Sequence, residues 1–175
     1  GIYRCHLDVV ARKVLRTRRH RRRRREARQE TAHCKAVGPF RSIHERSKVA
    51  DERVEFGHWE GDLIIGERNA SALITLNERV SRTQTVLDFP DGYKAYQVRE
   101  RLNRWIATKS SIELISLTWD HRREMTDWKT LTMSWGLDIY FADAHSPWQR
   151  GANENANRQL RFWLPKRTNL KVHTQ

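Results

Sequence analysis

The sequence predicts an α/β domain, a mixed five-stranded sheet flanked by helices, preceded by a basic N-terminal arm. Positive charge is concentrated at the start, where residues 1–50 hold 16 Lys and Arg against 4 Asp and Glu, whereas residues 51–175 hold 18 against 17. The second half instead alternates β-prone and helical segments. We therefore place a basic arm and linker at residues 1–55 and one folded domain at residues 56–175.

The arm is most basic at RTRRHRRRRR, residues 16–25, which includes Arg21, Arg22, Arg23, Arg24 and Arg25. Each Lys or Arg placed on a phosphate releases counterions, so this run indicates a polyanionic partner, with nucleic acid as the first candidate. Runs of like charge are also typical of solvated, disordered tails. The arm alone does not decide between these interpretations.

The folded domain is predicted to begin with three sequential antiparallel strands. The β-prone runs HWEGDLIIG, SALITLNERV and TQTVLDF start at residues 58, 71 and 83 and are separated by turn-like stretches. After these strands, predicted helices and strands alternate. The first helix covers residues 93–107, with Val98, Leu102 and Trp105 on its apolar face, and is followed by a strand at ISLTW. A second helix over residues 126–136, with Trp128, Leu131 and Trp135 on one face, is followed by a strand at DIYFA and by a last helix from HSPW to about Trp163.

The remaining composition points to a reduced cytoplasmic setting. The two cysteines, Cys5 and Cys34, form no disulfide framework or CxxC pair. The sequence contains no signal peptide and no apolar run of membrane-spanning length, so we expect no membrane partner. Because the first residue is Gly rather than Met, we expect a fragment or a processed chain.

Three carboxylates occupy positions that suggest chemistry. Asp62 lies between apolar residues inside the first strand, Asp120 ends the fourth, and Glu154 lies in the cationic final helix. An ionised carboxylate that points into a sheet loses hydration and needs a metal, an arginine or several donors to offset the loss. Singly, each also has a structural interpretation: Asp120 as a turn cap, Asp62 as a solvent-facing strand residue, and Glu154 in i,i+4 pairs with arginines.

Together, three convergent carboxylates predict a site for hard divalent cations. Mg²⁺ takes oxygen ligands, and two such ions can activate an attacking oxygen and stabilise a leaving one. Asn and Arg side chains near Glu154, including Arg150 and Asn153, would then bind the phosphate backbone of DNA. We therefore expect Mg²⁺ or Mn²⁺ as the cofactor.

Several motifs resemble one family. GHWEGDLIIG, TWD followed by EM, YFAD, HSPWQRG, NEN and LPK are similar to the catalytic domain of the IS-thirty family of bacterial insertion-sequence transposases. The resemblance runs from roughly Ser42 to the end of the chain. The 33 residues between Asp120 and Glu154 are typical of the DDE class to which that family belongs.

The resemblance implies an RNase H-like, integrase-type core with Asp62, Asp120 and Glu154 as catalytic and metal-binding residues. It implies metal-dependent cleavage at transposon ends and strand transfer into target DNA, possible homo-oligomers, and a bacterial cytoplasmic location at the nucleoid. Arg161 matches a basic position of such helices and would hold DNA near the metals.

The sequence departs from the family pattern where Arg122, Arg158 and Arg167 replace residues that are usually glycine, and where Ala144 replaces the usual proline. Arginine beside Asp120 or Glu154 could occupy a metal-binding carboxylate. The family also continues beyond LPKRTNLKVHT, and its helix-turn-helix region needs more than 50 residues, so we expect a truncated copy, incomplete at the C-terminus. Two alternatives therefore stay open: a catalytically inactive DNA-binding remnant, and a nuclease that hydrolyses strands without joining them.

Overall fold

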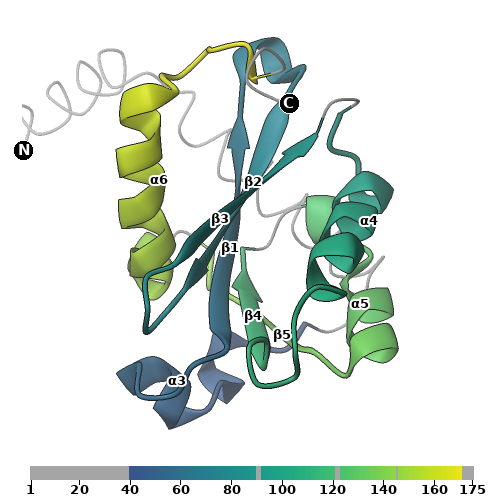
Figure 1. The fold of residues 1–175 in the computed structure, drawn as a ribbon, viewed down its shortest axis with the longest axis vertical. Coiled ribbons are helices and arrows are strands. Elements are labelled where there is room, and N and C mark those ends of the chain that lie inside the picture. Colours follow the sequence, from purple (N-terminus) through teal and green to yellow (C-terminus); the bar gives the residue numbers. More distant parts are fainter. Residues whose placement is uncertain (1–39, 90–91, 121–122, 145, 171–175) are drawn as a thin grey trace, which may run out of the picture. The chain divides into compact units, whose positions relative to one another are not determined.

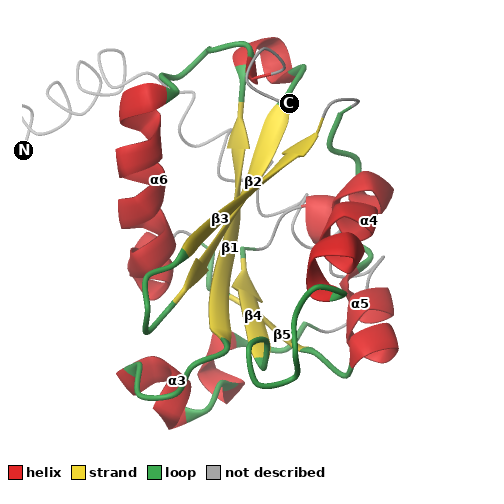
Figure 2. Cartoon of the chain, in the orientation of Figure 1, coloured by secondary structure: helices red, strands yellow, loops and turns green. Residues whose placement is uncertain are grey.

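A five-stranded mixed sheet forms the centre of the part of the chain that the computed structural model describes, residues 40–89, 92–120, 123–144 and 146–170. The strand order is β3-β2-β1-β4-β5. The strands are β1 (His58–Ile65), β2 (Ala72–Glu78), β3 (Gln84–Phe89), β4 (Ser116–Trp119) and β5 (Asp138–Phe141). Figure 2 shows the strands in yellow between the helices.

The pairing confirms the predicted mixed sheet. β1, β2 and β3 form an antiparallel meander, whereas β1, β4 and β5 run parallel to one another. Parallel neighbours need long crossover connections. The helix α4 (Ala95–Ile106) precedes β4, and α5 (Trp128–Trp135) connects β4 to β5.

Helices lie on both sides of the sheet. Figure 1 shows α6 (Gly151–Trp163) on one side and α4 with α5 on the other. The remaining elements are the short helix α3 (Lys48–Glu52) and the 3₁₀ turns Ile43–Glu45, Glu67–Asn69, Arg123–Met125 and Pro147–Arg150. None of the described helices combines the length and the apolar character needed to cross a bilayer.

The main apolar core lies between the sheet and α4. The predicted apolar face of α4 is buried, and Trp105 packs edge-on against Trp59 of β1 with ring centroids 4.9 Å apart. Gly61 of β1 is required by this packing, because a Cβ there would lie 1.9 Å from the ring of Trp119. Trp135 departs from its predicted buried face: it is exposed near the end of α5, where its indole N–H donates to Asn103 over 2.9 Å.

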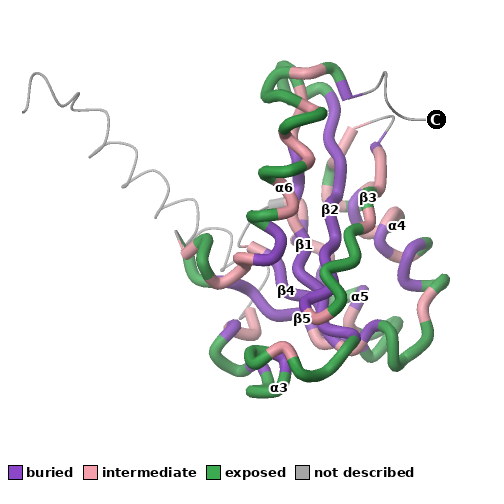
Figure 3. Tube along the Cα trace, turned by 60° about the vertical axis from the view of Figure 1, so that its left-hand side comes forward, coloured by how far each residue is buried: buried purple, intermediate pink, exposed green. Residues whose placement is uncertain are grey.

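The opposite face of β1 is directed at α6. Strand alternation places Glu60, Asp62 and Ile64 on one face. Ile64 clusters there with Leu160 and Leu164 near the end of α6, whereas the two acids lie under its first turns. Figure 3 shows β1 and β2 largely buried, while the outer side of α6 is exposed. This face therefore carries acids at one end and an apolar contact at the other.

Part of the predicted linker is structured. Residues 40–55 include α3 and contribute Ile43 and Ala50 to the buried side chains. The arginine run with Arg21 to Arg25 lies outside the described residues, so its predicted contact with DNA stays a prediction.

Candidate active site

Asp62 and Asp120 come from neighbouring parallel strands. In the register of β1 and β4, Glu60 is opposite Thr118, so extending it by two residues sets Asp62 beside Asp120. Their side chains are 23% and 16% exposed. The topology thus explains why two acids that are separated by 57 residues in the chain lie side by side on adjacent strands.

Arg150 lies between these two aspartates. Its Nη1 is 3.7 Å from Asp62 Oδ1, and its Nη2 is 3.4 Å from Asp120 Oδ2. Nη1 also donates to the Gly61 carbonyl over 3.1 Å, and the side chain is only 13% exposed. One guanidinium therefore offsets part of the negative charge of both carboxylates.

Besides this ion pair, Asp62 accepts two hydrogen bonds. Its Oδ1 accepts from the backbone N–H of Leu63 at 2.9 Å, and its Oδ2 accepts from the side-chain amide of Asn157 at 3.1 Å. Asn157 lies on the face of α6 that is directed at the sheet. The Asp62 carboxylate is therefore held by groups from β1, α6 and Arg150.

Glu154 is exposed on α6, next in sequence to the buried Asn153. Successive helix residues differ by about 100° in direction, so Asn153 can point at the sheet while Glu154 points beside it. Among the described residues, no group of three or more His, Cys, Asp or Glu is close enough to hold a metal ion. The structure therefore brings Asp62 and Asp120 together on one cation, but it does not bring Glu154 to them.

The donor chemistry nevertheless suits a hard divalent cation. Two carboxylates from rigid strands already face one positively charged group, and oxygen ligands of this type are those that Mg²⁺ prefers. Glu154 lies in the first turn of α6, which packs on β1, the strand of Asp62, and on β2.

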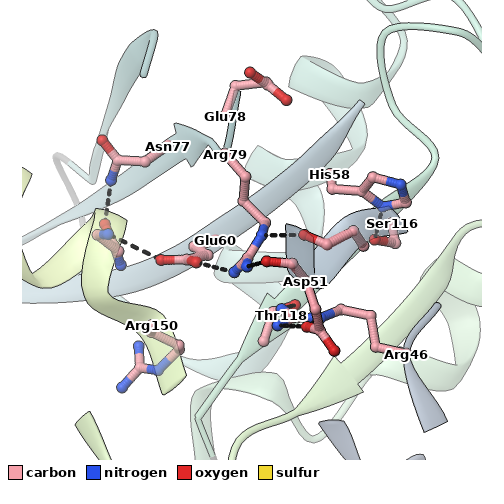
Figure 4. A network of polar contacts seen from close by, with 12 residues as sticks. Arg46, Asp51, His58, Glu60, Asn77, Glu78, Arg79, Ser116, Thr118 and Arg150 are labelled. Atoms are coloured by element: carbon pink, nitrogen blue, oxygen red, sulfur yellow. Dashed lines mark hydrogen bonds and ion pairs between the residues drawn. The ribbon is translucent and has the colours of Figure 1, made fainter. Parts of the chain in front are cut away.

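A buried acid fixes the start of α6. Glu60 is 0% exposed, and its Oε2 accepts from the backbone N–H of Asn153 at 2.9 Å. That N–H is one of the first-turn donors that have no partner within a helix, so Glu60 serves as a cap supplied by the sheet. Its other oxygen pairs with the guanidinium of Arg79, which follows β2. Figure 4 shows this pair, with Arg150 outside the network.

Further contacts hold Arg79 and Asn153 in place. Arg79 Nε donates to the carbonyl of Ala50 in α3 over 2.9 Å. Burial lowers the pKa of Arg79, although the charge of Glu60 opposes the shift. The Asn153 side-chain oxygen accepts from Asn77 and, over 3.2 Å, from Thr75, both on β2. The first turn of α6 is thus tied to β1 and β2.

The residues predicted to bind DNA are differently placed. Arg150 is directed inward, and Asn153 is buried in the contacts to β2. Arg161 donates to the backbone carbonyls of Ile65 and Leu164 over 3.1 Å and 3.4 Å. Burial lowers the pKa of Arg161, partly offset by the charge of Asp62. Their roles at DNA stay predictions.

The three arginines that replace the usual glycines of the family differ in their surroundings. Arg122 lies outside the described residues. Arg158 donates to Asn155 over 2.7 Å on the exposed side of α6 and does not pair with Glu154 in the described contacts. Arg167 adopts a φ of 73°, the left-handed conformation that glycine adopts freely.

Sequence reasoning missed Glu60, Arg79 and Asn157. Glu60 carried a usable signal, because it lies two residues before Asp62 and must share its face of the strand. A strand acid needs a partner when buried, but the sequence did not indicate which of many arginines supplies it.

Curated relatives identify the family of this chain. The chain is 42% identical over 134 residues to the transposase InsI for insertion sequence element IS30C of Escherichia coli strain K12, a match covering 76% of this chain and 34% of that protein. This chain belongs to the IS30 family of transposases. It is also 41% identical over 134 residues to the transposase for insertion sequence element IS1086 of Cupriavidus metallidurans, covering 77% of this chain and 39% of the relative. The IS30-family chain thus spans little more than a third of the length of these curated relatives. No protein-family model matches it.

Solved structures confirm the fold prediction. The catalytic core domain of BIV integrase matches with a TM-score of 0.51 at 18% identity, over 68% of this chain and 74% of that one. A chain of the simian T-cell lymphotropic virus intasome, solved in complex with the PP2A regulatory subunit B56 gamma, matches with a TM-score of 0.53 at 14% identity, over 71% and 44%. The IS30-family core therefore has the RNase H-like fold of integrase catalytic cores.

Proposed function

We propose that this IS30-family chain is the catalytic core of a DNA transposase that cuts insertion-sequence ends and joins them to target DNA with the help of Mg²⁺ or Mn²⁺. The observation that carries the proposal is the convergence of Asp62 and Asp120, from parallel neighbouring strands, on a single cationic group beside the helix that bears Glu154. The family adds support, because relatives at 41% and 42% identity are named transposases.

In this proposal, Asp62, Asp120 and Glu154 hold the divalent cations. A bound divalent cation supplies Lewis acidity, lowers the pKa of an attacking water and stabilises the leaving oxygen. Asn157 orients Asp62 through its amide. Glu60 holds the first turn of α6 through the backbone N–H of Asn153, and the side chain of Glu154, the next residue, turns inward to the cation.

DNA is held by cations on two parts of the chain. The arm, with Arg21 to Arg25, binds phosphates without sequence preference, and Arg150 and Arg161 act nearer the carboxylates. The substrates are the transposon ends and the target, the working form is a homo-oligomer that brings two ends together, and the site of action is the nucleoid in the bacterial cytoplasm.

Nicking of a supercoiled plasmid in Mn²⁺ tests the proposal. The full chain is compared with Asp62→Asn, Asp120→Asn and Glu154→Gln, and with Glu100→Gln as a control for loss of an exposed helical acid. Nicking and strand joining are expected from the full chain and the control, and from none of the three site variants. Nicking without joining would support a nuclease instead.

DNA binding is measured in parallel by anisotropy of a labelled duplex at several salt concentrations. Removing residues 1–30 is expected to lower the slope of log affinity against log salt by roughly 0.9 for each phosphate that the arm neutralises. Binding by the full chain with no nicking in any metal would indicate the catalytically inactive DNA-binding remnant.

A further inference from the structure

We propose that Arg150 is a positioning residue with two alternative places: between Asp62 and Asp120, where it excludes divalent cations, and outside them, where it contacts a DNA phosphate after a cation has replaced it. The inference rests on the proposed function, because it assigns a regulatory step to the same carboxylates.

The contacts of Arg150 are weak for so buried a cation. Charge-assisted N–H to carboxylate hydrogen bonds are about 2.7–2.9 Å long. The two ion pairs of Arg150 are 3.7 Å and 3.4 Å long. Its Nε is buried and finds no hydrogen-bond partner in the described structure. Apart from one hydrogen bond from Nη1 to the Gly61 carbonyl at 3.1 Å, Arg150 is therefore held between the aspartates by charge, an attraction that another cation can replace.

Charge balance favours the replacement. Arg150 supplies one positive charge to the two carboxylates, whereas one divalent cation supplies two. Because arginine cannot lose its proton in a protein, it cannot remain between the aspartates as a neutral ligand. Arg150 and a bound divalent cation therefore exclude each other.

The place of Arg150 in the chain allows it to leave. It is the last residue of the 3₁₀ turn Pro147–Arg150 and directly precedes α6, and no side chain caps the helix at this position. The start of the helix is held instead by Glu60 through Asn153. A change of Arg150 rotamer therefore leaves α6 in place and brings a cation to the surface beside Glu154, where DNA would be cut.

Calorimetric titration of Mn²⁺ into the full chain tests the exclusion. Arg150→Gln removes the competing cation and is expected to bind Mn²⁺ roughly tenfold more tightly or better, since one close unit charge is removed. Arg158→Gln is the matched control, because it removes the same charge from an exposed site on α6, the helix that follows Arg150, and is expected to change the affinity less than about threefold.

Arg150→Lys provides a second variant in case the glutamine variant does not fold. It keeps the charge but lacks the planar fork that reaches both carboxylates, so it is expected to bind Mn²⁺ more tightly than the wild type and less tightly than Arg150→Gln. Wild-type affinity in the Arg150 variants would overturn the inference, and so would an equal gain in Arg158→Gln. Absence of Mn²⁺ binding from every chain would instead overturn the proposed metal site itself.

DNA affinity gives an independent readout. In the wild type, Mn²⁺ is expected to raise the affinity for a blunt duplex and to steepen its salt dependence by about one phosphate contact, a slope change of roughly 0.9. Arg150→Gln is expected to lack this metal-dependent contact, whereas Arg158→Gln keeps it. The same metal-dependent change of slope in Arg150→Gln would contradict the outward position of Arg150.

Discussion

Glu60 and Asp62 lie two residues apart on the same face of one strand, under the same helix, yet their surroundings differ. Glu60 is fully buried and is hydrogen-bonded to Arg79 and to the backbone of α6. Asp62 is partly exposed and shares a loosely held arginine with Asp120. Two acids of one strand thus differ in role. The buried ion pair of Glu60 and Arg79 holds the start of α6, whereas the partly exposed Asp62 and Asp120 are accessible to a ligand.

The largest expected effect is that of Asp62→Asn, which should lower activity without lowering stability. Asp62→Asn is expected to lower the rate of plasmid nicking by roughly three orders of magnitude, because loss of metal-based charge stabilisation costs several kcal/mol and each 1.36 kcal/mol is a factor of ten. Its thermal unfolding should stay close to that of the wild type. An active Asp62→Asn variant would contradict the catalytic role that distinguishes Asp62 from the structural Glu60.

Glu60→Gln is expected to have the opposite profile. It leaves the buried Arg79 without its counter-charge, so urea unfolding should show a loss of about 3–5 kcal/mol. Replacing Glu60 and Arg79 together by Leu and Met is expected to recover only part of that stability, since apolar packing can replace the ion pair but leaves the Asn153 N–H and the Ala50 carbonyl without these partners. A loss below about 1 kcal/mol in the single variant would contradict the structural role given to Glu60.

The sequence predicts the fold more completely than it predicts the contacts of the candidate site. Period-two and helical patterns fixed the strands and helices to within a few residues, because burial of one face dictates them. The proximity of Asp62 and Asp120 could also be predicted, since a strand interior and a strand end are unusual places for acids, whereas their catalytic role stays a prediction. The inward position of Arg150 was not, because local spacing does not distinguish an arginine directed at the sheet from one directed at solvent.

Asn153 and Asn155 are a buried and an exposed asparagine of the same helix, α6, and their alanine variants are expected to differ in stability. Asn153→Ala leaves the buried donors of Asn77 and Thr75 without their acceptor, at an expected cost of about 2 kcal/mol in urea unfolding. Asn155→Ala removes only an exposed contact to Arg158, so its effect is expected to stay within about 0.5 kcal/mol. Equal losses in both variants would show that the first turn of α6 is not held by β2.

The smallest expected effect concerns backbone strain after α6. Arg167→Gly relieves the left-handed conformation at this position, a gain of about 1–2 kcal/mol that the greater freedom of glycine in the unfolded chain reduces by about 0.4–1 kcal/mol. A net stabilisation of roughly 0.5–1 kcal/mol is therefore expected in thermal or urea unfolding. Destabilisation would indicate that the Arg167 side chain makes a contact worth more than the strain.

The central claim is that Asp62, Asp120 and Glu154 together hold a divalent cation. Calorimetric titration of Mn²⁺ into the intact chain, Asp62→Asn and Glu154→Gln tests it most directly, because the structure places Glu154 away from the two aspartates. We predict binding by the intact chain that either substitution greatly weakens. Absence of binding by the intact chain, or equal binding by Glu154→Gln, would contradict the claim.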